Sequence, residues 1–594
     1  MASKVLIAAA APKGGAPLDV RKNKEAIKET IREAAAFGAQ ALIMPELCLS
    51  ASGVGSLFSH PHFLSACLDA ALEIAKECEG ITCAFGLPVT DGKKTYNALA
   101  VAGEGRILSF VIKKNLKQDQ ALFFDASCPD SLRVKGESIP CARQAVLPLP
   151  LPSAVLFYDD LKDRKPEASL VLAAAAIPAQ AGLLDAEALK PDDYMPRALA
   201  VANAGINEST TDLVYPGQAG IYAEGRTAAF ARPFMKELAV HGLSLPLLDK
   251  NQIETKKPLK MSRQMPYAPD SKEALDRWCE DAVEIAARAL AMRMKRIHVQ
   301  SVTLGVSGGL DSTMALVTSL RAFDILGLPR EGIYACSLPG LGSSNRTKNN
   351  AIRLMEAFDL KPHEIDLKPS ILRHFNDIKQ DINAHDAAYE NAQARERTQV
   401  LMDKANQLGG MMVGSGDLSE LALGFTTYGG DHMSMYGVNG GLYKTAIRLI
   451  LGHVAETTDN QSLKTVLLDI LDTPISPELL PGQGEIKQKT EDILGPYALN
   501  DFFLHRFLKD RKAPEDIVRE AARVFSGKHD EGEIKTRLNA FFKRFFASQF
   551  KRNCLPDGPM VLGVSLSPRN GFTLPSDASG DLYLSGQSGK GKQK

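Results

Sequence analysis

The chain has 594 residues, which predicts several domains, or two large ones if the folds are α/β. Its 70 basic and 70 acidic side chains cancel, so nothing in its charge suggests nucleic acid or an anionic membrane as a partner. Hydrophobic residues at 45% and charged residues at 24% are typical of a globular protein and exclude a disordered or fibrous chain.

The cysteines and the apolar segments of the sequence predict where in the cell the protein is located. Nine cysteines without a CxxC pair predict neither a disulfide framework nor a zinc site, and they favour a reducing cytoplasm. The amino terminus shows no charged lead, long apolar core and cleavage pattern, so we expect no secretory signal. The most apolar later stretch, residues 168–184, is shorter than the ~20 residues of a membrane span. We therefore expect a cytoplasmic protein without a membrane segment.

The first half of the sequence alternates short aliphatic runs with helical patterns, which predicts an α/β fold. In chain order we expect a strand at 4–10, a helix at 21–37, a strand at 41–44, a helix at 63–78 and strands at 81–85, 98–101, 107–112, 154–158 and 169–177. This spacing suits a sandwich of sheets covered by helices. A Lys-, Pro- and Met-rich stretch follows, which predicts a first domain at 1–250 and a linker at 251–270.

The second half predicts another α/β domain at 271–584, followed by a flexible Gly-, Ser- and Lys-rich tail at 585–594. We expect a helix at 272–295, a strand at 299–306, a helix at 312–326, a strand at 333–337, a helix at 345–358 and a strand at 410–413. This order predicts a doubly wound parallel sheet.

The sharpest local pattern is LGVSGGLDSTMAL at 304–316, a strand, a Gly-Gly turn and an Asp-Ser pair that opens a helix. Gly308 and Gly309 allow positive φ and close backbone approach, and the N–H groups of the helix start bind anions. No Lys follows the glycines, so this is not the GxxxxGK[ST] loop; Asp311 instead suits a magnesium ion that bridges phosphate oxygens. We expect a nucleotide site, and the structural alternative is a turn with Asp311 as a local cap.

The SGGLDS string resembles the loop of the ATP-pyrophosphatase superfamily. The strings ENAQAR, GSGDLSE and QFKR resemble NAD synthetase, and QFKRNCLPDGPMV and LSPRNGFTLPSD resemble the carboxy-terminal part of its long, two-domain form. From residue 272 onward the resemblance is nearly end to end. It implies a nitrilase-like α/β sandwich followed by a doubly wound, adenine nucleotide alpha hydrolase-like domain, and assembly into a homo-oligomer.

The same resemblance implies the site residues of the second domain. ATP is expected at Gly305, Val306, Ser307, Gly308, Gly309, Leu310, Asp311, Ser312, Leu338 and Ser415. Deamido-NAD is expected at Asn391, Arg395, Arg397, Glu420, Phe425, Thr426, Thr427, Tyr428 and Lys551. Asp311 and Glu420 are expected to hold Mg²⁺, and Lys444 to contact phosphate. Structural alternatives are that both arginines pair with Glu390 and Glu396 at the surface, and that Lys444 is a solvated charge.

The implied reaction has two steps and uses ATP as substrate. The nicotinate carboxylate of deamido-NAD attacks the α-phosphate of ATP and releases pyrophosphate, and ammonia then displaces AMP from the acyl-adenylate to give NAD. Asp311, Glu420 and Lys444 are the expected catalytic residues. A general base for ammonia is Asp417 or Asp431, and the sequence does not choose between them.

In long NAD synthetases the nitrilase-like domain hydrolyses glutamine with a Glu base, an oxyanion Lys and a Cys nucleophile. Glu46 in ALIMPELCLS matches the base, and Lys113 in VIKKNL matches the lysine, with Lys114 as the alternative. The string NESTTDLVYPGQAGIYAEGR at 207–226 resembles later strands of that domain. The nucleophile position, in SAVLFYDDLKD, falls on Phe157 or Tyr158.

Neither aromatic side chain supplies a thiolate, and a phenol of pKa about 10 is a poor nucleophile. We therefore expect an inactive glutaminase, with Glu46 and Lys113 left as a vestigial ion pair, and ammonia taken from solution or from a separate glutaminase. A relocated nucleophile is the alternative; Cys128 and Cys141 precede the strand, and Cys48 reads as buried packing. Further alternatives are a catalytically silent scaffold or regulator and an enzyme that amidates another carboxylate.

Overall fold

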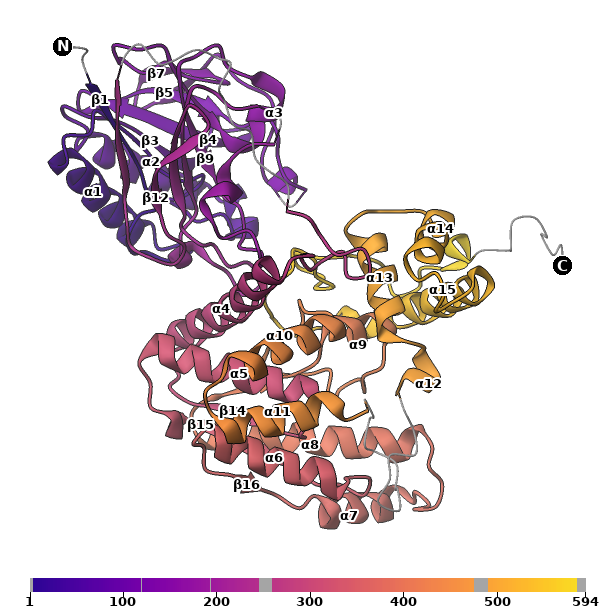
Figure 1. Ribbon diagram of the computed structural model, residues 1–594. Helices are drawn as coiled ribbons and strands as arrows, with labels where there is room; N and C mark the ends of the chain where they lie inside the picture. Colours follow the sequence, from indigo (N-terminus) through magenta and orange to yellow (C-terminus); the bar gives the residue numbers. More distant parts are fainter. Residues whose placement is uncertain (1–3, 119, 193, 245–258, 475–489, 585–594) are drawn as a thin grey trace. The chain divides into compact units, whose positions relative to one another are not determined.

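The computed structural model describes residues 4–118, 120–192, 194–244, 259–474 and 490–584 (Figure 1). The chain divides into two compact units. The first contains Met1–Ala179 and Leu183–Pro258, and the second contains Gln180–Gly182 and Leu259–Lys594. Within the described residues, no helix has the length and apolar character needed to cross a membrane.

The first unit is a two-sheet sandwich. Its larger sheet has the order β13-β1-β2-β3-β4-β5-β7-β6 and its smaller sheet the order β12-β11-β10-β9-β8. The strands are β1 Lys4–Ala9, β2 Ala41–Ile43, β3 Thr82–Thr90, β4 Thr95–Gly103, β5 Arg106–Ile112, β6 Ser131–Val134, β7 Glu137–Ala142, β8 Ser153–Phe157, β9 Leu170–Ala175, β10 Ala198–Asn203, β11 Ala219–Ala223, β12 Arg226–Ala231 and β13 Ala239–Ser244. The helices are α1 Val20–Ala36, α2 Pro61–Ala75 and the short α3 Leu161–Arg164. The predicted sandwich is confirmed.

Alternation along the strands places two cores on opposite faces of the larger sheet. In β4, Ala98 and Ala100 pack in the cluster that contains α1 and α2, whereas Leu99 and Val101 pack between the two sheets. This follows from the two-residue period of a strand, which turns successive side chains to opposite faces. Both faces of β4 are buried, which is why its sequence reads as a continuous apolar run.

The second unit contains one parallel sheet of order β16-β15-β14-β17-β18. Its strands are β14 Val302–Gly305, β15 Ile333–Ser337, β16 His363–Glu364, β17 Met411–Gly414 and β18 Tyr436–Gly437. Its helices are α4 Lys272–Ile297, α5 Leu310–Leu326, α6 Asn345–Ala357, α7 Lys368–Ile378, α8 Ala387–Gln407, α9 Leu418–Leu423, α10 Lys444–Thr457, α11 Gln461–Asp472, α12 Thr490–Leu494, α13 Tyr497–Leu508, α14 Pro514–Val524, α15 Glu531–Ala547 and α16 Gln549–Arg552.

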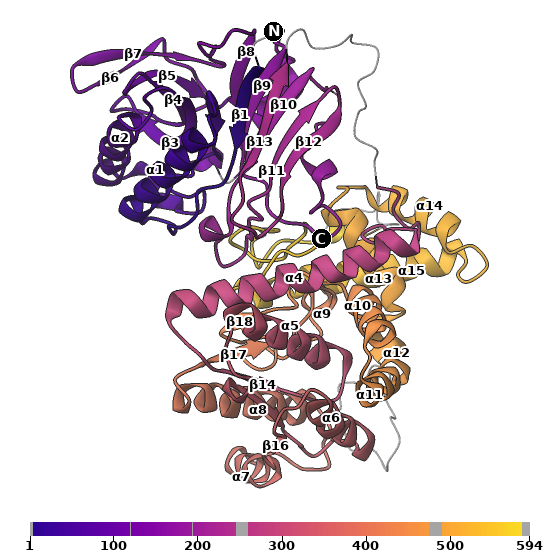
Figure 2. The same ribbon diagram turned by 60° about the vertical axis from the view of Figure 1, so that its left-hand side comes forward.

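The predicted doubly wound sheet is confirmed, because α5 and α8 pack against opposite faces of β14 (Figure 1, Figure 2). The chain leaves β14 for β15 on one side and later returns to β17 on the other. Ligands of open α/β sheets bind outside the carboxyl ends of the strands at such a reversal point. The fold therefore directs attention to the ends of β14, β15 and β17.

The predicted linker at 251–270 is only partly described, since residues 251–258 lie outside the described residues, as does the tail at 585–594. From Leu259 the chain belongs to the second unit. Met261 and Pro269 form an antiparallel bridge, and Tyr267 is buried and stacks on Tyr443 with ring centroids 4.2 Å apart. The described part of this stretch is therefore packed structure, because an aromatic anchor outweighs its Lys- and Pro-rich composition.

Candidate active site

A cavity of about 410 Å³ opens at the carboxyl ends of β14, β15 and β17 in the second unit. Every residue predicted to bind ATP lines it except Gly308: Gly305, Val306, Ser307, Gly309, Leu310, Asp311, Ser312, Leu338 and Ser415. Ser337, Ser343, Thr347, Lys348 and Thr398 also line the cavity and were not predicted. They come from β15, α8 and the start of α6, and no motif in the sequence marks them.

The SGGLDS loop has the strand, turn and helix geometry that was expected. Gly308 has φ +80°, and a Cβ there would lie 2.2 Å from the carbonyl oxygen of Thr347, so only glycine fits. Gly309 instead has φ −100° and forms the N-cap of α5, so the expected positive φ is wrong at this position. Ser312 Oγ accepts from the N–H of Ser307, with 3.2 Å between nitrogen and oxygen. The free N–H groups at the start of α5 favour an anion in the cavity.

A buried lysine joins three carboxylates at the bottom of the loop. Lys444 Nζ lies 2.5 Å from Asp311 Oδ2, 2.6 Å from Asp417 Oδ2 and 2.8 Å from Glu420 Oε1. Only 1% of Lys444 is exposed, so the alternative of a solvated charge is wrong. Asp311 bonds to Lys444 and does not cap α5 with its side chain, so the local-cap alternative is wrong as well.

Burial and charge oppose each other in this group. Burial raises the pKa of Asp311 to about 7 although Lys444 lowers it, and burial also raises the pKa of Glu420 above its usual range. Burial alone lowers the pKa of Lys444, but the three carboxylates together raise it well above its ordinary value. With all groups ionised, three negative charges face one positive charge, and the excess favours a cation.

The carboxylate set also fits a divalent metal ion. Asp311, Asp417 and Glu420 each offer an oxygen, and these oxygens lie within 4.8 Å of one another. Asp311 Oδ1 is buried and has no hydrogen-bond partner among the described residues, so it is a free acceptor. Hard oxygen donors of this kind suit Mg²⁺.

Most residues that were expected at deamido-NAD also line the cavity. Asn391, Arg397, Glu420, Phe425, Thr426 and Thr427 line the cavity. Thr427 Oγ1 donates to Asn391 Oδ1 over 2.8 Å, which joins α8 to the loop after α9. Glu390 lines the same cavity.

Arg395, Tyr428 and Lys551 do not line the cavity, and they support its wall from behind. Arg395 Nε donates to the carbonyl oxygen of Tyr428 over 3.2 Å. Lys551 Nζ donates to the carbonyl oxygens of Gly424 and Thr426 over 2.8 and 2.6 Å. These bonds fix the backbone on either side of Phe425.

The two acids considered as a base for ammonia have different surroundings. Asp417 Oδ1 accepts from the N–H groups of Ser419 and Glu420, and its Oδ2 lies 2.6 Å from Lys444 Nζ. Asp431 lines the cavity and accepts from the N–H of Thr427 over 2.6 Å. The geometry favours Asp431 as a proton acceptor, whereas Asp417 is one of the three carboxylates around Lys444.

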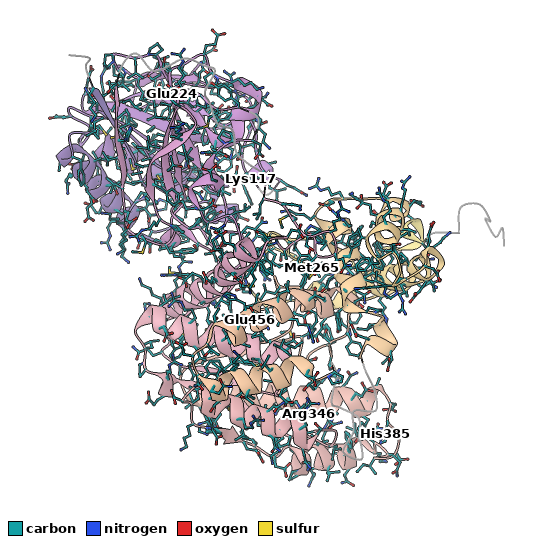
Figure 3. All side chains as sticks on the ribbon, in the orientation of Figure 1. Lys117, Glu224, Met265, Arg346, His385 and Glu456 are labelled. Carbon is teal, nitrogen blue, oxygen red and sulfur yellow. The ribbon has the colours of Figure 1, made fainter. Side chains whose placement is uncertain are left out.

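In the first unit, Glu46 and Lys113 form a buried pair. Lys113 Nζ lies 2.7 Å from Glu46 Oε2 and 2.7 Å from Asp159 Oδ2. Glu46 Oε1 also accepts from Asn97 and Gln120, over 2.8 and 2.7 Å. The alternative, Lys114, pairs with Asp163 at the surface. Lys117, labelled in Figure 3, lies 3.8 Å from Asp159 and donates to the carbonyl oxygen of Ala176.

The expected nucleophile position carries two packed aromatic rings. Phe157 is fully buried between the sheets, and Lys113 Nζ lies 5.6 Å from its ring centre. Tyr158 packs in a separate cluster with Leu156 and Leu161, and burial raises its pKa above the usual range. Neither position presents a sulfur to Lys113.

The cysteines lie in other surroundings. Cys48 is buried, which raises the pKa of its thiol well above the ordinary value, and its Sγ lies 3.8 Å from the carbonyl oxygen of Gly86. Cys128 and Cys141 are half-buried, and their sulfurs contact the carbonyl oxygens of Pro129 and Ile139. Burial raises the pKa of both thiols, which weakens them as nucleophiles.

Comparison with known proteins agrees with these two units. Residues 282–547 match the family model described as NAD synthase. The chain is 30% identical to the glutamine-dependent NAD(+) synthetase of Mycobacterium tuberculosis, with 95% of each chain covered, and equally similar to that of Mycobacterium leprae. Its fold is similar to a glutamine-dependent NAD(+) synthetase from Cytophaga hutchinsonii, at TM-score 0.74 and 19% identity over 97% of this chain and 98% of that one.

A second solved structure is glutamine-dependent NAD+ synthetase from Acinetobacter baumannii in complex with ADP, at TM-score 0.64 and 18% identity over 93% and 94% of the chains. At 18–19% sequence identity, these two solved structures show a similarity of fold alone. The sequence relatives extend across both units and match the region that forms the cavity. The chain therefore belongs to the two-domain NAD synthetase family.

Proposed function

We propose that the chain converts deamido-NAD to NAD with ATP and ammonia, through an acyl-adenylate, and that its first unit does not hydrolyse glutamine. The synthetase part rests above all on Lys444, which is buried among three carboxylates where the SGGLDS loop meets a cavity of about 410 Å³. A group with this charge and burial is suited to hold polyphosphate and a metal ion together.

The loop at 305–312 and the start of α5 would receive the phosphates of ATP through backbone N–H groups. Asp311 and Glu420 would hold Mg²⁺, which would neutralise phosphate charge, and Asp417 keeps Lys444 beside them. Because Lys444 is buried, its ammonium would stabilise negative charge on the leaving pyrophosphate better than an ammonium in bulk water.

Deamido-NAD would lie along the opposite wall, with Asn391 and the 425–427 loop beside it. Arg397 supplies a fixed positive charge for a phosphate of the dinucleotide. Asp431 would take a proton from ammonium, so that neutral ammonia attacks the acyl carbon and AMP leaves. Closure of the cavity around the adenylate would exclude water.

Loss of glutaminase activity is supported by the occupied side chains of the first unit. Both oxygens of Glu46 accept hydrogen bonds, and Lys113 is bound to two carboxylates. The position expected to carry the nucleophile holds Phe157 or Tyr158. The relatives are named glutamine-dependent, so this chain would differ from them in its nitrogen source.

The test is NAD formation by the purified chain from deamido-NAD, ATP and Mg²⁺, with ammonium or glutamine as the only nitrogen source. We expect product with ammonium and none with glutamine. Equal rates with glutamine would support a relocated nucleophile, to be located by Cys48→Ala, Cys128→Ala and Cys141→Ala. Activity with neither source would favour a silent scaffold or a different carboxylate substrate.

A further inference from the structure

The segment 439–444 contacts both the backbone and the side chain of Asp311. Asn439 Nδ2 donates to the backbone carbonyl oxygen of Asp311 over 2.9 Å, and Lys444 Nζ lies 2.5 Å from its carboxylate. The second hydrogen of the same Asn439 amide goes to the carbonyl oxygen of Ser415, also over 2.9 Å. Asp311 lies in the first turn of α5 and Ser415 follows β17, so one planar amide joins the two loops that line the cavity.

The backbone between these two side chains completes the connection. The carbonyl oxygen of Leu442 accepts from the N–H of Leu418 over 2.9 Å. The N–H of Lys444 donates to Ser419 Oγ over 2.9 Å. The segment 439–444 is thus bonded to the start of α5 and to the start of α9, which carry the acids around Lys444.

Asn439 has features that packing alone does not explain. The residue is fully buried, and its Oδ1 has no hydrogen-bond partner in the part of the chain that the structure describes. An unpaired buried acceptor costs free energy, so the amide oxygen of Asn439 contributes no stabilising hydrogen bond here. What the amide supplies is two donors in one plane, which fix two carbonyl groups relative to each other.

We propose that Asn439 is a positioning residue for the adenylation step, because its amide sets the distance between the SGGLDS loop and the Ser415 loop and thereby the placement of Asp311. This inference rests on the proposed function. Loss of the amide leaves Lys444 bonded to Asp311 but lets the two loops move apart. A displacement of about 1 Å at reacting groups costs up to roughly 100-fold in rate.

The chain offers a matched control in Asn500. Its Nδ2 also donates to two backbone carbonyl oxygens, those of Leu494 and Gly495, and only 3% of the residue is exposed. Asn500 does not line the cavity. Asn439→Ala and Asn500→Ala each remove a buried two-carbonyl amide, so they share the structural loss and differ in their position.

Two readouts test the proposal on the full-length chain. The first is exchange of labelled pyrophosphate into ATP in the presence of deamido-NAD and Mg²⁺ without ammonium, which reports adenylation alone. The second is the calorimetric affinity for ATP. We expect Asn439→Ala to lower kcat/KM for ATP in exchange roughly 10- to 100-fold and to weaken ATP binding, with an unchanged affinity for deamido-NAD. Asn500→Ala leaves all three values near wild type.

Asn439→Leu keeps the approximate shape of the side chain and has no donors, so it carries the same test if the alanine variant does not fold. Equal kinetic and binding losses in Asn439→Ala and Asn500→Ala would overturn the proposal. If the wild type fails to exchange pyrophosphate but Asn439→Ala still weakens ATP binding selectively, the proposed function fails, and Asn439 positions the two loops for ATP binding and not for adenylation. If neither variant changes ATP binding or exchange, the positioning role fails.

Discussion

Lys113 Nζ lies 2.7 Å from Asp159 Oδ2 and equally close to Glu46 Oε2, so one buried ammonium joins both sheets of the first unit. Glu46 follows β2 and Lys113 follows β5 in the larger sheet, whereas Asp159 follows β8 in the smaller one. A lysine expected to stabilise an oxyanion is therefore fixed between two layers of the sandwich. This placement gives Glu46 and Lys113 a structural role that does not depend on a catalytic cysteine.

We expect Lys113→Met to destabilise the first unit by about 3–5 kcal/mol, because it leaves the carboxylate of Glu46 buried without its cation. The matched control is Lys114→Met, which removes an ion pair with Asp163 whose side chains are about half exposed, so that little stability is lost. Urea unfolding measures both variants. We expect the ammonium-dependent activity of the folded fraction to stay at the wild-type level in each variant. Equal urea midpoints of unfolding for the two variants would contradict the role of Lys113 in joining the two sheets.

Lys444→Met is expected to lower kcat with saturating ATP and deamido-NAD by roughly 10²–10³-fold, since one fixed charge at the reacting phosphates is lost. The control is Lys272→Met at the start of α4, where an exposed lysine contacts Asp276 and Glu456. Both variants remove an ammonium between carboxylates, and only the first lies at the cavity. A kcat for Lys444→Met within a few-fold of that for Lys272→Met would refute the catalytic role of the lysine.

The fold was predictable from the sequence where patterns are local. Alternating runs predicted the strands of the sandwich, and the Gly-Gly turn before an Asp-Ser pair predicted the start of α5. Strands β16 and β18 have two residues each and carry no periodicity to detect. The stretch before α4 has the composition of a linker, but the buried ring of Tyr267 determines its packing.

The site was predictable only as far as motifs extend. Asp311, Glu420 and Lys444 follow from family strings, yet their meeting depends on pairs such as Asp311 and Lys444, which are 133 residues apart. Asn439 joins the cavity loops through tertiary hydrogen bonds, and Asp159 joins the pair of Glu46 and Lys113 through a tertiary ion pair. Neither role was predicted from the sequence. Asp417 was considered as a base, and its N-cap position three residues before Glu420 is the one local sign that one of its oxygens accepts from the backbone.

Lys551→Met is expected to raise the KM for deamido-NAD about tenfold while the KM for ATP stays constant, because two carbonyl groups beside Phe425 lose a charged donor. Lys509→Met is the control, since Lys509 Nζ donates to the carbonyl oxygen of Gly563 and does not line the cavity. Initial rates at varied deamido-NAD measure the effect. Parallel increases in both KM values would show general distortion of the cavity and not a local change of its wall.

Glu208 predicts how the stability of the first unit depends on pH. Its Oε1 accepts from the N–H of Gly205, its Oε2 is buried without a described partner, and burial raises its pKa from 4.5 to about 8. The folded state therefore binds this proton more tightly than the unfolded state. The resulting stabilisation is complete below about pH 4.5 and is lost as the pH rises through about 8.

Glu208→Gln keeps the acceptor for Gly205 and cannot ionise, so it should match wild type near pH 5 and exceed it in stability at pH 8.5 by up to roughly 4 kcal/mol. Glu137→Gln, at an exposed position in β7, is the control and should show no such divergence. Calorimetric unfolding of all three proteins between pH 5 and 8.5 gives the comparison. A constant difference between Glu208→Gln and wild type across this range would mean that Glu208 ionises in the folded protein at its ordinary pKa, and that the buried side chain is reached by water.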